Sequence, residues 1–340
     1  MNNGLAVSVL DLVGTYPGDS PGNAIARSVG LARHVEALGY KRFWLAEHHS
    51  IEGLACSATP VLIGHVASAT TSIRVGSGGV MLANHAPLVV AEQFGTLEAM
   101  YPGRIDLGLG RAPGGGSAAM HALRRDLNQT KKDFSALLKE LRTYLGPVMP
   151  GQVVKAIPGQ GSNVPITLLG SSGFTAQLAA MEGLPFAFAA HLAPENLQWS
   201  TRQYRDGFHS SNALPSNALR RAHLMVAVQV IAAETDDAAR RLFTTPQQRL
   251  LHSIRNQSVE LLPPVDSMEP LWNEIERAAV MSRLKAAIVG SSATVKAGLE
   301  KLVSETGADE IIVVTDTYEH EDRLRSYERV AVVAREIACC

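Results

Sequence analysis

Residues 43–46 form a short apolar run, and the ionisable side chains of Glu47, His48 and His49 follow it directly. In an α/β chain, a strand that ends this way delivers those side chains to its C-terminal end, where parallel sheets and barrels bind ligands. The unperturbed pKa of histidine lies close to neutral pH, so the pair favours proton transfer or metal binding. The alternative is a polar loop whose histidines only cap neighbouring backbone groups, and the motif alone leaves both interpretations open.

Two glycine-containing segments have the composition of anion sites. Gly110-Arg111 stands where a strand is expected to end, so the guanidinium there can hold a phosphate through two hydrogen bonds. A surface arginine in a flexible loop is the alternative. In residues 169–175, Ser171 and Ser172 precede a helix, where hydroxyls and unpaired backbone N–H groups converge. Helix capping uses the same donors and is compatible with phosphate binding, whereas the similar residues 289–292 are interpreted as capping alone.

A third segment, Ser77-Gly78-Gly79, suits a flat ligand. Glycine has no Cβ and tolerates unusual dihedral angles, so a planar group can lie against the backbone there. A β-bulge or a simple turn is the alternative interpretation.

Three other enzyme classes fit the sequence less well. Residues 108–114 resemble a dinucleotide fingerprint, but Pro113 occupies the position of its third glycine and no acidic residue follows at the expected distance. The chain has no Gly-x-Ser-x-Gly motif of a serine hydrolase. His85 and His191 are expected near strand ends and can join the histidine pair around a metal ion. The usual spacings of histidine and cysteine metal ligands do not occur, however, so the sequence predicts a site without a metal.

The composition favours a soluble, cytoplasmic globular protein. Hydrophobic residues make up 46% of the 340 residues and the formal net charge is −1, which predicts binding to neither nucleic acid nor membrane. The three cysteines include an adjacent pair at the C-terminus, and this number and spacing do not suit a disulfide framework. We find no secretory leader pattern and no apolar run of the roughly 18 residues that a membrane span requires.

Apolar β-branched runs alternate with helical patterns along the whole chain, as in repeated βα units. Eight strands are expected, at residues 5–10, 42–46, 73–78, 105–109, 166–169, 186–189, 224–231 and 311–314. Helices are expected at 24–38, 57–69, 87–100, up to about 145, 175–182, 195–209, from 236, 295–303 and 322–337. Eight such units predict a single (β/α)8 barrel, a TIM barrel, over residues 1–340. Residues 247–285 fit neither a strand nor a linker and are interpreted as an insertion between strands seven and eight, lying over the barrel mouth.

Taken in order, these segments resemble one family, the bacterial luciferase-like flavin monooxygenases. The resemblance covers nearly the whole chain, and four motifs carry it in the family's order and spacing: residues 46–49, 76–82, 102–111 and 169–172. It implies a (β/α)8 barrel that binds reduced FMN at its C-terminal face. There, reduced flavin and O2 give a C4a-peroxide that oxidises a small organic substrate.

Site residues are carried over position by position from this resemblance. His48 matches the catalytic histidine beside the flavin ring, with Glu47 next to it in the cofactor site. Gly78-Gly79 matches a cis peptide under the ring. Gly110 and Arg111, with Ser171 and Ser172, match the phosphate-binding positions. Gly170 departs from the pattern, because luciferase has a glutamate there.

The resemblance also implies partners and leaves alternatives. A separate flavin reductase is expected to supply the reduced FMN, and a homodimer is expected to pack through the helices that follow strands two and three. Residues 247–285 and 114–116 are candidate walls or lids above the flavin. An F420-dependent hydride-transfer enzyme and a non-catalytic FMN-binding protein are the alternatives. Aldehydes, sulfur compounds and polycyclic metabolites are all open as substrates.

Overall fold

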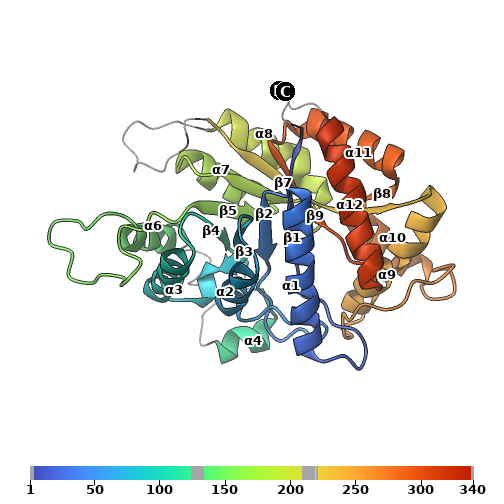
Figure 1. The fold of residues 1–340 in the computed structure, drawn as a ribbon, viewed down its shortest axis with the longest axis horizontal. Coiled ribbons are helices and arrows are strands. Elements are labelled where there is room, and N and C mark those ends of the chain that lie inside the picture. Colours follow the sequence, from blue (N-terminus) through green and yellow to red (C-terminus); the bar gives the residue numbers. More distant parts are fainter. Residues whose placement is uncertain (1–3, 113, 124–133, 209–218, 220, 338–340) are drawn as a thin grey trace.

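Eight parallel strands close into a barrel in the computed structural model, which describes residues 4–112, 114–123, 134–208, 219 and 221–337 (Figure 1). Going around the barrel, the strands are β1 (Ala6–Asp11), β2 (Arg42–Leu45), β3 (Arg74–Met81), β4 (Ile105–Gly110), β5 (Ile166–Gly170), β6 (Phe186–Ala189), β7 (Leu224–Ala233) and β9 (Glu310–Val314). Pairing of β9 with β1 and of β6 with β7 closes the ring. The eight strands and the (β/α)8 fold predicted from the sequence are confirmed.

Helices surround the barrel as an outer ring, and α1 and α12 pack side by side (Figure 1). Within the described residues they are α1 (Pro21–Leu38), α2 (Thr59–Ala69), α3 (Pro87–Met100), α4 (Ser117–Ala122), α6 (Phe134–Leu145), α7 (Gly173–Met181), α8 (Leu197–Asp206), α9 (Asp236–Ile254), α10 (Glu274–Arg283), α11 (Ser292–Thr306) and α12 (His320–Glu336). Two short 3-10 turns accompany them, η1 (Leu82–Asn84) and η2 (Pro194–Asn196). No described helix is long and apolar enough to cross a membrane. Part of the helical region expected before Leu145 lies outside the described residues.

Local sequence explains where these elements start and stop. The side chain of Ser20 accepts a hydrogen bond from the Asn23 backbone, Pro21 opens α1, and Gly39 ends it in the left-handed conformation. All ten residues of β7 and all six of β4 are buried. Burial on both faces is expected of parallel strands that line a barrel interior and carry helices outside.

Residues 247–285, which fit neither a strand nor a linker in sequence, contain helical structure. Helix α9 continues through Pro246 to Ile254, and α10 begins at a capping box in which Asn273 and Glu276 exchange hydrogen bonds. These helices cover a second apolar core beside the barrel, formed by residues that include Phe243, Leu251 and Val280.

A ninth strand, β8 (Ile288–Ser291), extends this second core and was not predicted. It pairs only with the C-terminal half of β7, at residues 230–233, and so lies outside the closed ring. Predicted capping by the serines there was also wrong, since no side chain caps α11. Asp236 of α9 instead accepts hydrogen bonds from the Ser291 backbone at 2.6 Å and the Thr294 hydroxyl at 2.8 Å.

The segment between α9 and α10 reaches back over the barrel mouth. The backbone of Val259 donates to the Glu52 carbonyl and that of Leu261 to the Thr15 carbonyl, both at 2.9 Å. These contacts join the segment to the loops that follow β1 and β2. This part of the segment therefore lies beside the C-terminal ends of β1 and β2.

Buried charges fill the opposite, N-terminal end of the barrel. Arg42 contacts Asp106 at 2.8 Å and Glu310 at 3.0 Å, and Arg74 contacts Asp106 at 2.6 Å. Trp44 Nε1 also donates to Asp106, at 3.1 Å. The four charged groups come from β2, β3, β4 and β9, so this cluster ties together strands that are distant in the sequence.

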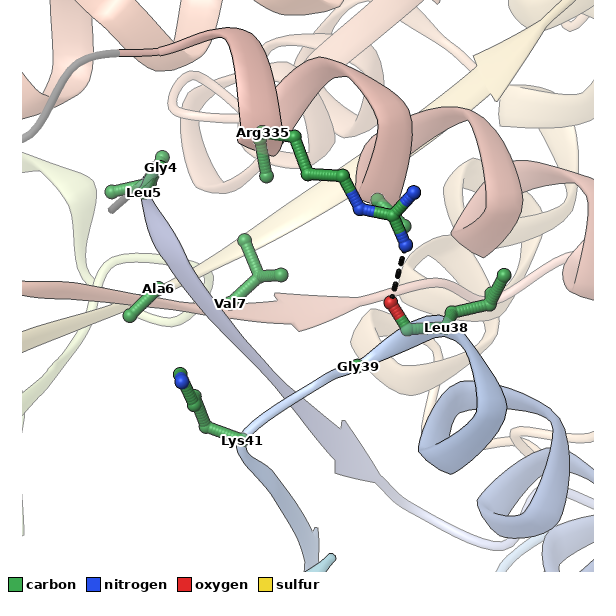
Figure 2. Close-up of a pocket in the computed structure, with 10 residues that line it drawn as sticks. Gly4, Leu5, Ala6, Val7, Leu38, Gly39, Lys41 and Arg335 are labelled. Atoms are coloured by element: carbon green, nitrogen blue, oxygen red, sulfur yellow. Dashed lines mark hydrogen bonds between the residues drawn. The ribbon is translucent and has the colours of Figure 1, made fainter. Parts of the chain in front are cut away.

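A shallow cavity of about 360 Å³ lies outside the barrel wall at this same end, where β1 meets α1 and α12 (Figure 2). Arg335 of α12 crosses it and donates to the Leu38 carbonyl at the end of α1, at 2.9 Å. Apart from Lys41 and Arg335, apolar side chains and glycines line it. It holds no histidine, hydroxyl or carboxylate that would handle a substrate.

Candidate active site

A cavity of about 330 Å³ lies at the C-terminal ends of the strands, and all eight strands of the ring or their following loops contribute to its wall. Its lining includes Leu10, Leu12, Trp44, Ala46, His48, Gly78, Gly79, Met81, Gly110, Arg111, Ala112, Leu169, Gly170, Ser171, Ser172, Thr175, Ala187, Ala189, His191, Leu192, Ala227 and Ile312. Seven of the eight positions predicted for the site are therefore together around one space. Glu47 is the exception.

Two histidines face this cavity from different strands. His48 follows β2 and His191 follows β6, where its Nδ1 lies 3.3 Å from the Ala227 carbonyl. Burial, and then the positive charge of Arg249, lower the pKa of His48 to about 4. Burial also lowers the pKa of His191. His48 is thus an uncharged imidazole at neutral pH, able to accept a proton.

Arg249 reaches the site from α9, one of the helices of the second core. Its guanidinium lies 2.8 Å from the Asp316 carboxylate, which follows β9. The side chains of both residues are only 10% and 12% exposed. The pair carries no net charge, so Arg249 affects His48 by its proximity without making the mouth strongly basic.

Groups whose chemistry suits an anion form another side of the cavity. Arg111, after β4, lies over the ring of Phe174 in the first turn of α7, with 4.3 Å from guanidinium carbon to ring centre. Ser172 is the N-cap residue of α7, yet its side chain makes no capping hydrogen bond. The hydroxyls of Ser171 and Ser172 and the first N–H groups of α7 are therefore available to an anion beside a guanidinium. None of the ion pairs among the described residues involves Arg111.

A glycine step forms part of the cavity wall at β3. The peptide bond between Gly78 and Gly79 is cis, as the family resemblance implies. A Cβ added at Gly78 would lie 2.6 Å from the Leu10 side chain, and one at Gly79 would lie 2.7 Å from the Gly108 carbonyl oxygen. Only glycine fits at both positions without moving the residues packed behind them.

Glu47 points away from the cavity, although its neighbour His48 lines it. Its carboxylate is 1% exposed and lies 2.8 Å from His49 Nε2 and 2.9 Å from His85 Nε2. Burial alone would raise the pKa of Glu47, but the hydrogen bonds and charges of His85 and His49 outweigh it and lower the pKa. Glu47 therefore lies behind the cavity wall, where it would not contact a cofactor bound in the cavity directly.

A family model described as luciferase-like monooxygenase matches residues 6–329. The chain belongs to the luciferase-like monooxygenase family. It is 51% identical over 330 residues to the uncharacterized protein YvbT of Bacillus subtilis strain 168, with 96% of each chain covered. It is 44% identical over 333 residues to a luciferase-like monooxygenase of Escherichia coli K12, covering 98% of each chain.

Solved structures of the family share the barrel. Apo-MsnO8 is 34% identical, has a TM-score of 0.84, and is matched over 97% of this chain and 98% of its own. The predicted family membership is confirmed, and it supports an oxidoreductase.

Some lining residues of this luciferase-like chain were not predicted. Leu10 and Trp44 lie on strands whose apolar residues all look alike in sequence, so nothing distinguishes those that face the ligand end. Thr175 lies behind Gly170, where an added Cβ would be 2.7 Å from the Thr175 side chain. A glutamate at position 170, as in luciferase, would therefore displace Thr175.

The two candidate walls differ from the prediction in detail. Gly114 and Gly115 pack on the backbone carbonyls of Glu47 and His49, where an added Cβ would lie 2.9 Å away in each case, and neither glycine lines the cavity. Residues 247–285 are likewise absent from the lining. One of them, Arg249, still affects the site, because its positive charge lowers the pKa of His48.

Proposed function

We propose that this chain is a flavin-dependent monooxygenase that uses reduced FMN and O2 to oxidise a small organic substrate. The observation that carries the proposal is a single cavity with three parts. His48 lies on one side, the flat Gly78-Gly79 step on another, and Arg111 with Ser171 and Ser172 on a third. The last cluster suits a phosphate, and the apolar remainder suits a planar ring.

The donor set fits FMN in its chemistry. The guanidinium of Arg111 and the free hydroxyl of Ser172 would hold the phosphate, with the α7 N-terminus supplying backbone N–H groups. Reduced flavin, when bound, supplies the electrons that activate O2. His48 would accept or return a proton on its imidazole during substrate oxidation, and the buried wall would exclude water.

The relatives favour oxygen chemistry, while the fold alone leaves the cofactor open. A protein of Bacillus subtilis strain 168 named N-acetyl-S-alkylcysteine monooxygenase is 30% identical over 95% of this chain. One structural neighbour is a 3,6-diketocamphane monooxygenase in complex with FMN, at 16% identity, and another is an F420-dependent secondary alcohol dehydrogenase, at 14%. We therefore keep F420-dependent hydride transfer as the second candidate.

Oxygen uptake by the purified protein tests the proposal. The protein is mixed with a flavin reductase, FMN and NADH, with and without a panel of aldehydes, sulfur compounds and polycyclic metabolites, and products are analysed by mass spectrometry. We expect product that carries one oxygen atom from 18O2. Tighter binding of F420 than of FMN, with substrate reduction in the absence of oxygen, would replace this proposal by hydride transfer. FMN binding without product from any substrate class would favour a non-catalytic flavin-binding protein.

The expected partners follow from the same proposal. Reduced FMN would come from a separate reductase by transient contact. A homodimer would pack through α2 and α3, which expose apolar side chains at Val61, Val89 and Met100 (72%, 43% and 53% exposed). Light scattering after gel filtration should give twice the mass of one chain, and V61E should shift the mass toward one chain.

A further inference from the structure

Behind the wall of the cavity, two histidines converge on one buried carboxylate. Glu47 Oε1 lies 2.8 Å from His49 Nε2 and 2.9 Å from His85 Nε2, and all three atoms lie within 4.8 Å of one another. None of these three residues lines the candidate active site. The cluster is thus a separate feature, adjacent to the site but facing away from it.

Each member is fixed by the backbone around it. The second oxygen of Glu47 accepts a hydrogen bond from the Met81 backbone at 3.3 Å. The His49 backbone donates to the Gly114 carbonyl at 2.9 Å, and the His85 backbone donates to the Leu82 carbonyl at 3.2 Å. The cluster therefore stands where the loops after β2, β3 and β4 meet. Second contacts that orient a carboxylate are a feature of built metal sites.

Charge distinguishes this cluster from an ordinary ion pair. A carboxylate that is 1% exposed requires a compensating positive charge, and the ion-pair partners of Glu47 among the described residues are His49 and His85. The imidazole nitrogens that lie at hydrogen-bond distance from this carboxylate are also atoms that can coordinate a cation. A divalent cation at the centre of the three atoms would supply the positive charge.

We propose that Glu47, His49 and His85 form a binding site for a divalent transition metal, of which Zn2+ is the best match. Two imidazole nitrogens and one carboxylate oxygen are a frequent ligand set for Zn2+, at bond lengths of about 2.0–2.2 Å. The two oxygen-to-nitrogen distances, 2.8 and 2.9 Å, would open by about half an ångström to admit a tetrahedral ion with bonds of that length, and the ligand atoms already lie within 4.8 Å of one another. The side chains of His49 and His85 are 16% and 28% exposed, so water can reach the remaining coordination position.

Such an ion would join the loops after β2 and β3, and the His49 backbone connects them to the loop after β4; all three loops carry parts of the cavity wall. His48 lies between the ligands Glu47 and His49, the Met81 backbone donates to Glu47, and Arg111 precedes the loop of Gly114. The metal would thus act structurally, by fixing these loops relative to one another. This role does not depend on which cofactor the cavity binds.

Zn2+ binding to chelator-treated protein tests the proposal. Calorimetric titration should show one Zn2+ per chain, and metal analysis after gel filtration should recover it. H49A, H85A and E47Q should each weaken binding by roughly 100-fold, at least as much as loss of a supporting contact in known sites. H65A removes an exposed histidine of α2 and should bind Zn2+ like the unchanged protein.

Thermal melting separates a loss of Zn2+ binding from a failure of the variant to fold. Zn2+ should raise the melting temperature of the unchanged protein and of H65A, because an ion that binds only the folded state stabilises that state. The H85A variant, if folded by circular dichroism, should melt at the same temperature with and without Zn2+. The proposal is overturned if the unchanged protein binds no Zn2+, or if H65A loses as much binding as H49A. Binding that persists when all three ligands are replaced would also overturn it.

Discussion

The two ends of this barrel differ in whether their charged and polar side chains are paired with one another. At the N-terminal end, Asp106 and Glu310 are 2% exposed, and Arg42 bridges them within ion-pair distance. At the C-terminal end, burial keeps His48 uncharged, and Arg111 lies on an aromatic ring with no carboxylate partner among the described residues. One end is a closed network of satisfied charges, whereas the other keeps its hydrogen-bonding groups available.

The difference shows which polar residues stabilise the fold and which are left for chemistry. Buried charges that satisfy one another hold strands together, and removing one partner leaves the other without compensation. Groups that face a cavity without partners gain nothing for folding and are available to a ligand. Substitutions at the two ends should therefore separate stability from activity.

The largest effect is expected at His48. H48A should lower substrate oxidation by roughly 10²- to 10⁴-fold, the contribution typical of a positioned acid or base. FMN affinity, measured by quenching of flavin fluorescence, should stay within a few-fold of the unchanged protein, because the side chains that would hold the FMN phosphate lie elsewhere in the cavity. H65A serves as the matched control at an exposed histidine. Equal loss of oxidation and FMN binding in H48A would assign the residue a structural role.

The next effect belongs to the N-terminal network. D106N keeps the shape of the side chain but removes the carboxylate that pairs with Arg74 and one of the two that pair with Arg42, so the free energy of unfolding should fall by about 3–5 kcal/mol. Urea unfolding followed by circular dichroism measures it. FMN affinity of the folded fraction should be unchanged. E300Q, at an exposed position of α11, should alter stability by less than about 0.5 kcal/mol.

Sequence patterns located the strands and the cavity but not the partners of each charged group. Eight apolar β-branched runs identify the strands. The polar residues at their C-terminal ends include His48 and Arg111, and all strands of a parallel barrel end at the same face, where ligands bind. The ion pair of Arg42 with Glu310 joins residues 268 apart in sequence, and no local pattern reveals it. The orientation of Glu47 away from the cavity likewise depends on His85, which lies 38 residues further along.

Strand β8 escaped prediction for a related reason. Its four residues, Ile288–Ser291, include a glycine and a serine, and they pair only with an extension of β7. Such a short run resembles a loop before a helix until the partner strand is known. For helix α9 the sequence predicted only a start at residue 236, and the structure continues it through Pro246, although proline usually ends a helix. Packing of α9 in the second core compensates for the backbone hydrogen bond that Pro246 cannot donate.

The acid stability of the N-terminal network gives the third prediction. Burial alone would raise the pKa of Glu310, but the hydrogen bond from His223, the charge of Arg42 and the hydrogen bond from Ser8 lower it to about 2. A glutamate in the unfolded chain has a pKa of about 4.3. The carboxylate therefore stabilises the fold above about pH 4.3, and this stability is lost as the pH falls toward 2.

Comparison with a variant isolates that contribution. Between about pH 5 and pH 2, the free energy of unfolding of the unchanged protein should fall by about 3 kcal/mol more than that of E310Q. Chemical unfolding at each pH measures both slopes. Parallel slopes for the two proteins would show that Glu310 does not carry the acid dependence.

A smaller effect is expected at Arg111. R111A should weaken FMN binding by about 10- to 100-fold, as expected for loss of hydrogen bonds between charged groups. Stability should change little, because Arg111 lies over the face of Phe174 and is paired with no carboxylate in the described part of the chain. Riboflavin, which lacks the phosphate, should bind R111A and the unchanged protein alike. A similar loss for riboflavin would place Arg111 at the ring instead of the phosphate.

The smallest effect, at Ser172, decides between helix capping and ligand binding. A capping serine replaced by alanine costs about 1 kcal/mol of stability, but the Ser172 side chain makes no capping hydrogen bond to α7. S172A should therefore leave the free energy of unfolding unchanged and weaken FMN binding by roughly 2- to 10-fold, the value of one hydrogen bond. S20A removes a true cap, at the start of α1, and should do the reverse. If S172A destabilised the protein as S20A does, the Ser172 hydroxyl would be a helix cap, and only Arg111 and the α7 backbone would remain as candidate anion-binding groups.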